Sequence, residues 1–80
     1  MTNEESIQVQ ECTMELRACV NTIEFIANHC GKSESDVDVM DRAIKRLDAI
    51  IAMPMIVSSG LDVAPCQAAK NLGIEWLERN

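Results

Sequence analysis

The sequence has almost no aromatic residues. Phe25 and Trp76 are its only two, and tyrosine is absent from all 80 positions. Apolar residues nevertheless make up 48% of the chain, so a core has to be assembled from Leu, Ile, Val, Met, Ala and Cys, which suit closely packed helices. A chain of this length forms one domain near the lower limit for a self-supporting core. We therefore expect a single helical domain over residues 1–80.

Basic residues are also scarce. Seven Lys and Arg stand against thirteen Asp and Glu, which gives a formal net charge of −6. Within the first 30 residues the only base is Arg17. The five acids of that segment are Glu4, Glu5, Glu11, Glu15 and Glu24. Because nucleic-acid binding depends on Lys and Arg neutralising phosphates, this charge disfavours a nucleic acid and favours a protein partner with a basic surface. Ordinary surface charge is the alternative interpretation.

The sequence contains no long apolar run. None approaches the ~20 residues that span a bilayer, and the opening residues MTNEESIQVQE lack the basic start and apolar segment of a secretory signal. We therefore expect no membrane association and a cytoplasmic location, where the four cysteines would stay reduced.

The first helix is predicted from apolar residues that recur at alternating spacings of three and four, a heptad pattern. These residues are Val9, Cys12, Leu16, Cys19, Ile23, Ile26 and Cys30. Thr2 and Glu5 have the spacing of a capping box, and Gly31 is a typical residue just beyond a helix end. The pattern predicts a helix over about 3–30.

Two further helices follow the same logic. Ser33 is the expected cap of a second helix over about 34–53, which Pro54 ends. In the mostly apolar connector, Pro54 and Gly60 favour one short extra turn at 54–59. Asp62 is the expected cap of a third helix over about 63–78. The prediction is an all-α, three-helix bundle built on a long αα-hairpin.

The third helix carries its small residues on one side. Cys66, Ala69 and Gly73 fall on one stripe, with Trp76 at its end. Glycine inside a helix costs ~1 kcal/mol relative to alanine. We therefore expect Gly73 to allow a close approach to the other two helices, or to break the helix there.

The first helix is long for so short a chain. About 27 residues at ~1.5 Å each would extend ~40 Å, whereas a compact 80-residue domain is ~30 Å across. Either the bundle is elongated, or a second copy covers the excess apolar seam.

Residues suited to catalysis or metal binding are few. His29 is the only histidine and has no evident carboxylate beside it, and no serine has a base near it in sequence. His29, Cys30 and Cys66 lack the close CxxC or HxxxH spacing typical of zinc sites. Because cysteine behaves as a small apolar residue, core filling is the expected role of all four. We expect no enzyme, no metal and no cofactor.

Two apolar segments indicate binding instead. A second line on the first helix, Met14, Ala18 and Phe25, faces away from the heptad seam. The connector adds Met53, Met55, Ile56 and Val57. Apolar surface outside one core is typical of contact sites, although the other helices could cover both segments. The expected partner-binding residues are Glu4, Glu5, Glu11, Met14, Glu15, Ala18, Phe25, Met53, Met55 and Ile56.

One segment resembles a DNA-binding motif. The stretch AAKNLGI, within CQAAKNLGI at residues 66–74, is similar to the helix-turn segment of Fis-like and other bacterial helix-turn-helix proteins. The resemblance implies a turn at Gly73 and a recognition helix from Ile74 through EWLERN. Only six residues follow Ile74, and Glu75 and Glu78 are acidic, whereas a reading helix places several side chains near bases and Lys or Arg on phosphates.

The predicted function is therefore that of a small, acidic, non-enzymatic interaction protein. We expect it to self-associate as a homodimer through the first helix and to bind and modulate another protein. Similar size and charge are common among phage and prophage inhibitors, an analogy that implies inhibition of the partner. The alternative hypothesis is a small helix-turn-helix-like transcriptional regulator.

Overall fold

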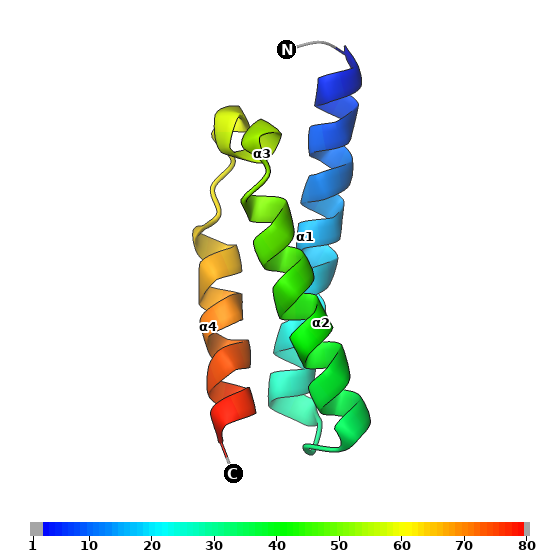
Figure 1. Cartoon of the computed structure of the whole chain (residues 1–80), viewed down its shortest axis with the longest axis vertical. Helices are drawn as coiled ribbons and strands as arrows, with labels where there is room; N and C mark the ends of the chain where they lie inside the picture. Colours follow the sequence, from blue (N-terminus) through cyan, green and yellow to red (C-terminus); the bar gives the residue numbers. More distant parts are fainter. Residues whose placement is uncertain (1–2, 80) are drawn as a thin grey trace.

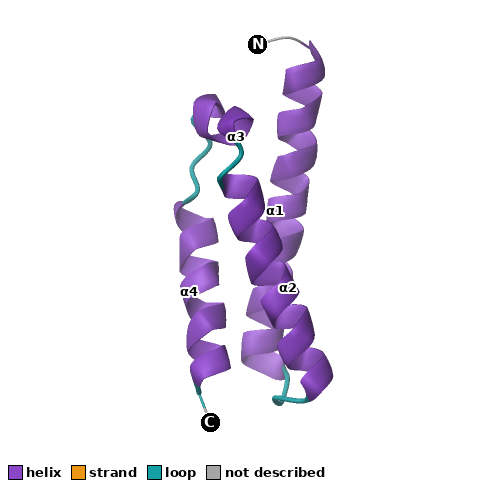
Figure 2. Cartoon of the chain, viewed as in Figure 1, coloured by secondary structure: helices purple, strands orange, loops and turns teal. Residues whose placement is uncertain are grey.

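Four helices account for nearly all of residues 3–79, the part of the chain that the computed structural model describes (Figures 1 and 2). They are α1 (Asn3–His29), α2 (Glu34–Ile51), α3 (Pro54–Ser59) and α4 (Ala64–Glu78). The predicted all-α bundle of three long helices is confirmed, and the expected short turn is the six-residue helix α3. The expected cap at Thr2 lies outside the described residues.

The ends of the helices follow local chemistry. Ser33 and Asp36 form the capping box of α2: the Ser33 hydroxyl accepts from the Asp36 backbone N–H at 3.1 Å, and the Asp36 carboxylate accepts from Ser33 N–H at 3.4 Å. Helix α2 ends at Ile51, two residues before the predicted end, because Met53 is already the extended residue that precedes α3. Before α4 the cap position is occupied by Val63 and not by Asp62 as predicted. The Asp62 carboxylate accepts from the Ala64 N–H at 3.0 Å from one residue earlier.

The two connecting glycines behave differently. Gly60 closes α3 in the left-handed conformation at φ 75, which glycine adopts at no steric cost. Gly31 follows the end of α1 as expected, but its φ is not positive, because Gly60 is the only residue with positive φ among the described ones. The left-handed helix end that is typical of glycine is therefore found at α3 and not at α1.

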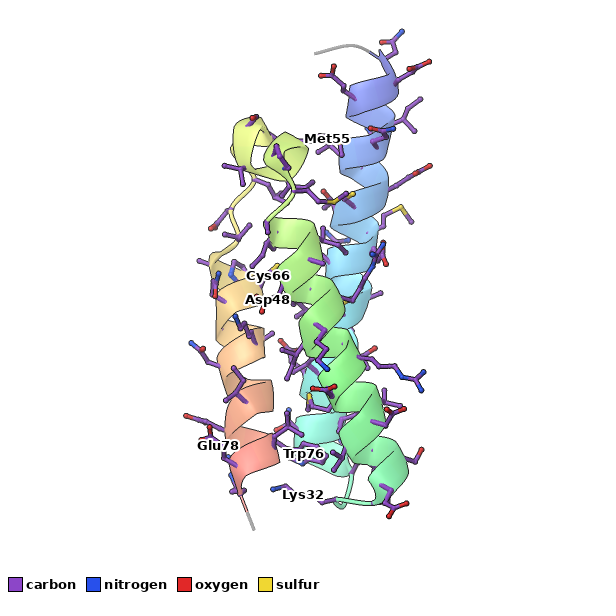
Figure 3. All side chains as sticks on the ribbon, in the orientation of Figure 1. Lys32, Asp48, Met55, Cys66, Trp76 and Glu78 are labelled. Carbon is purple, nitrogen blue, oxygen red and sulfur yellow. The ribbon has the colours of Figure 1, made fainter. Side chains whose placement is uncertain are left out.

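The core lies between α4 and the hairpin of α1 and α2. Helix α1 contacts each of the other three helices, and α4 also packs on α2. Figure 3 shows Cys66 and Trp76 on the side of α4 that faces the hairpin, where both are buried. The other buried apolar side chains are Leu16, Cys19, Ile23, Ile26, Met40, Ile44, Leu47, Ile50, Ile56 and Ala69. The predicted heptad seam of α1 supplies four of these buried residues.

Helix α4 packs closely on α1 and α2 at Gly73. A Cβ atom at this position would lie 2.9 Å from both Ile44 Cδ1 and Met40 Sδ, and 3.1 Å from Ile23 Cγ2. Helix α4 continues through Gly73 without a break. Of the two expected reasons for this glycine, close packing is therefore confirmed and a break in the helix is not found.

The bundle is elongated, with extents of 46 × 18 × 16 Å. Helices α1 and α4 run in the same direction and α2 runs against them, while the first turns of α1 extend beyond α3 (Figure 1). Two ion pairs join the long helices at their edges: Arg46 of α2 with Glu15 of α1, and Lys70 of α4 with Asp48 of α2.

Candidate interaction surface

The outer face of α1 carries large apolar side chains in solvent. Ile7, Met14 and Phe25 are 54%, 73% and 59% exposed, and Ala18 between them is also exposed. We call these four residues the outer stripe. At 3.6 residues per turn they share one line along the helix, on the side opposite the buried seam of Leu16 and Ile23. The structure thus places the predicted Met14, Ala18 and Phe25 together, and adds Ile7.

The outer stripe has heptad spacing of its own. Glu11 and Asn21 fill the two gaps in it, so that positions 7, 11, 14, 18, 21 and 25 alternate by four and three. Both side chains are exposed. A helix with a second heptad line on its outer side is built to contact a second helix there, because this spacing keeps one stripe against a neighbour along its whole length.

Phe25 is held in place by the end of its own helix. Its ring stacks on the His29 ring with centroids 4.8 Å apart and planes 21° from parallel. His29 Nδ1 lies 3.1 Å from the Phe25 carbonyl oxygen, which requires the proton to be on Nδ1. The aromatic ring is therefore presented to solvent in a fixed orientation, which reduces the entropy lost on binding.

An open hollow of ≈ 550 Å³ lies beside Phe25, between α1 and the start of α2. Val39 of α2, 40% exposed, forms its far wall. The remaining lining residues are Asn21, Thr22, Ile26, Cys30 and Asp36. The hollow continues the apolar surface of the outer stripe onto α2 and could receive an aliphatic side chain from a partner.

The predicted acidic residues separate into two groups. Glu4, Glu5 and Glu11 are exposed near the start of α1. Glu15 is bound within the molecule, because Arg46 donates from Nε and Nη2 to its two carboxylate oxygens at 2.5 and 3.0 Å. This bidentate pair of hydrogen bonds to the Arg46 guanidinium holds the pKa of the Glu15 carboxyl below its ordinary value. Glu15 therefore ties α1 to α2.

The connector does not form one binding patch. Met53 and Val57 are 40% and 67% exposed, Met55 is half-buried, and Ile56 is only 1% exposed. The prediction that Ile56 is available to a partner is therefore wrong, because α3 packs on α1 and α2 and Ile56 fills the core beneath it. Figure 3 shows Met55 on the side of α3 that faces α1.

Helix α4 has no helix-turn-helix geometry over 64–78. It is one continuous helix through Gly73 and Ile74, so the turn implied by the resemblance is not formed. Its C-terminal end is held by Lys32, which donates to the Leu77 carbonyl at 3.2 Å and lies 5.6 Å from the Trp76 ring centroid. The basic residues of α2 are also engaged: Arg42 with Asp38 and Lys45 with Asp41.

The cysteines are distributed through the core. Cys19 and Cys66 are buried, while Cys12 and Cys30 are half-buried, and burial raises the pKa of the Cys19 and Cys66 thiols. Over residues 3–79, no group of three or more His, Cys, Asp and Glu side chains is placed to hold a metal ion. In the same range no helix has the length and apolar character needed to cross a membrane.

Two surface residues were missing from the predicted set. Ile7 lies seven residues before Met14, and that spacing alone would have placed it on the same line. Val39 could not be predicted in this way, because its position next to Phe25 depends on how α2 is rotated against α1.

Comparisons with protein-family models, with curated proteins and with solved structures found no match. The class of protein that the structure defines is an all-α helical bundle. The surface of the chain itself is therefore the basis for a functional proposal.

Proposed function

We propose that this chain is a non-enzymatic interaction protein that self-associates through the outer stripe of α1 and binds, and thereby inhibits, a protein partner with a basic surface. The observation that carries the proposal is the outer stripe: three large apolar side chains, each more than half exposed, on one line of the longest helix. Exposed apolar surface of this kind is stabilised by contact with another protein.

The charge of α1 supports the second half of the proposal. Glu4 and Glu11 stand three and four residues from Ile7, so they lie beside the outer stripe on the same helix face. Arg46 neutralises Glu15 farther along. A self-associated pair of chains would place the acidic residues of both copies around one interface, where they favour a basic partner and repel a phosphate backbone.

The alternative function, direct DNA reading, has no comparable support. The continuous α4 offers no second helix after Gly73 over the described residues, and the four Lys and Arg side chains of α2 and α4 are all paired with carboxylates. These contacts favour the protein-binding proposal over DNA reading.

Polar substitution of the outer stripe tests the self-association. We expect Met14→Ser with Phe25→Ser to shift the chain toward monomer, because the replacement removes the largest exposed apolar groups of α1 while leaving the core unchanged. The measurement is sedimentation velocity over a range of concentrations, with circular dichroism to confirm folding. Val57→Ser is the matched control, since Val57 is 67% exposed but lies on α3. Equal assembly of the double variant and the control would contradict the proposal.

The partner is tested separately. The tagged chain is used to capture proteins from a lysate, and Glu4→Gln should reduce the capture of basic proteins while self-association remains. Glu75→Gln is the control, because it removes the same charge from the exposed side of α4. Equal loss with both variants would mean that net charge alone governs binding.

A further inference from the structure

We infer that two copies of this chain pair α1 against α1 in antiparallel orientation, with the two-fold axis crossing the outer stripe between Met14 and Ala18, at the level of position 16 along the helix. The inference rests on the self-association proposed above and specifies its geometry. In this pair the outer stripe of one copy is covered by the outer stripe of the second copy.

The outer stripe is symmetric about its centre. Ile7 and Phe25 each lie nine residues from position 16, Met14 and Ala18 each lie two residues from it, and Glu11 and Asn21 each lie five. In an antiparallel pair, Ile7 therefore faces the partner's Phe25, Met14 faces the partner's Ala18, and Glu11 faces the partner's Asn21. Each large side chain near the centre meets a small one, as interlocking helices require.

Position 16 is also the middle of the helix. Helix α1 spans Asn3–His29, so thirteen residues lie on either side of position 16. An antiparallel pair in this register overlaps over the full ~40 Å of both helices, without an unpaired end. The first turns of α1, which extend beyond the rest of the bundle (Figure 1), would then lie along the second half of the partner's α1.

Charge favours this orientation over a parallel one. A parallel pair would place Glu11 against the partner's Glu11 and Ala18 against the partner's Ala18, which combines like charges at one level with a gap at another. In the antiparallel pair the Asn21 amide can donate to the partner's Glu11 carboxylate. Two pairs of like charges approach beside the axis, Arg17 with the partner's Arg17 on one edge and Glu15 with the partner's Glu15 on the other. Arg17 is exposed and screened by solvent, and each Glu15 is paired with Arg46 of its own chain.

The hollow beside Phe25 fits the same arrangement. Ile7 of one copy reaches the level of Phe25 on the other, where the hollow of ≈ 550 Å³ is walled by Val39. An aliphatic side chain entering there would cover Phe25 and Val39 together, which are 59% and 40% exposed in the single chain. The N-terminal overhang of one copy and the hollow of the other are thus complementary.

Opposite charges at positions 7 and 25 test the orientation. Ile7→Glu alone and Phe25→Lys alone each place two charges against apolar residues in the antiparallel pair, so each should weaken self-association about tenfold or more. An equimolar mixture of the two variants should assemble again. At one end of the mixed pair the new carboxylate at position 7 faces the new ammonium group at position 25, and at the other end Phe25 still faces Ile7. The readout is sedimentation velocity, with circular dichroism and Trp76 fluorescence as controls for folding.

The outcomes distinguish a wrong antiparallel register from an absence of self-association. In a parallel pair, the same mixture sets each new charge against an apolar residue, so its assembly stays well below that of the unmodified chain. That result, with assembly of the unmodified chain, would overturn the antiparallel register and leave self-association standing. Unaltered assembly of both single variants would exclude the outer stripe altogether. A strictly monomeric unmodified chain at high concentration would refute self-association itself.

The double variant on one chain gives an independent check. Ile7→Glu combined with Phe25→Lys retains both opposite-charge contacts in an antiparallel pair, so its assembly should exceed that of either single variant and weaken as salt is added. In a parallel pair the combination sets like charges together at both levels. Assembly below that of the single variants would therefore contradict the inference.

Discussion

At position 73 the space for a side chain is already occupied by three others. Ile44 and Met40 approach from α2 and Ile23 from α1, each within 3.1 Å of where a Cβ would lie. The ends of Ile44 and Met40 can move, but the branched Cγ2 of Ile23 is fixed close to its backbone. Glycine is therefore present for packing, at a cost in helix propensity of ~1 kcal/mol relative to alanine.

We predict that Gly73→Ala lowers the free energy of unfolding by about 1 kcal/mol, because overpacking costs ~1–3 kcal/mol and improved propensity recovers part of it. Gly73→Val should lower the free energy of unfolding further, because its branched side chain cannot be accommodated by moving the side-chain ends of Ile44 and Met40. Urea denaturation measures both. Gly31→Ala is the control: nothing lies within 4 Å of its Cβ and its φ is not positive. Stabilisation by Gly73→Ala would show that α4 stands farther from α1 and α2.

The ion pair between Glu15 and Arg46 joins α1 to α2. Glu15 and Arg46 are half-exposed, so their ion pair is weakened by solvent. Because Arg46 contacts both carboxylate oxygens at once, the pair forms only in the rotation of α2 against α1 that the core packing sets. That rotation positions Val39 beside Phe25 and so shapes the hollow.

We predict that Glu15→Gln causes a small decrease in melting temperature at neutral pH, and that the decrease disappears in acid. The pKa of Glu15 is lowered by Arg46, so the pair stabilises the fold above the ordinary carboxyl pKa and its contribution is lost as pH falls through the folded value. Melting curves of both proteins at neutral pH and below about pH 4 provide the measurement. Glu24→Gln, an exposed change on the same helix, should have no such pH-dependent effect. A pH-independent difference would argue against the ion pair.

The helices themselves could be predicted from the sequence because long heptad patterns define both an element and its buried face. The seam from Val9 to Cys30 and the capping box at Ser33 are examples, and the burial of Cys66, Ala69, Gly73 and Trp76 followed from their spacing. The connector could not be resolved in this way. Six residues are too few to define a helical face, so Ile56 and Val57 looked equivalent although one is buried and the other is 67% exposed.

In the candidate site, too, some residues could be predicted from the sequence and others could not. The exposed line of Met14, Ala18 and Phe25 was predictable, since it repeats on one helix. The pairing of Glu15 with Arg46 was not, because it joins positions 31 residues apart through the relative rotation of two helices. Local periodicity specifies which face of an element is apolar, whereas contacts between polar faces depend on packing that the sequence pattern does not encode.

The whole molecule depends on α1, which contacts every other helix. Cys19 lies on α1, whereas Cys66 and Trp76 lie near opposite ends of α4, so these three residues report on the core along its length. A core shared by all three long helices should open in one cooperative transition, as small single domains usually do. Detachment of α4 alone would expose the apolar side chains that α1 and α2 bury against it.

We predict two classes of thiol in the native protein. Cys12 and Cys30, which are half-buried, should react with an alkylating reagent first, and Cys19 and Cys66 should be protected. Burial and the raised pKa of the latter two both act in this direction, because a higher pKa leaves less of the reactive thiolate at a given pH. Peptide mapping by mass spectrometry identifies the modified residues. The protection of Cys19 and Cys66 should be lost at the same urea concentration at which Trp76 fluorescence changes. Earlier reaction of Cys66 would mean that the start of α4 unfolds separately, and the single cooperative core would then be wrong.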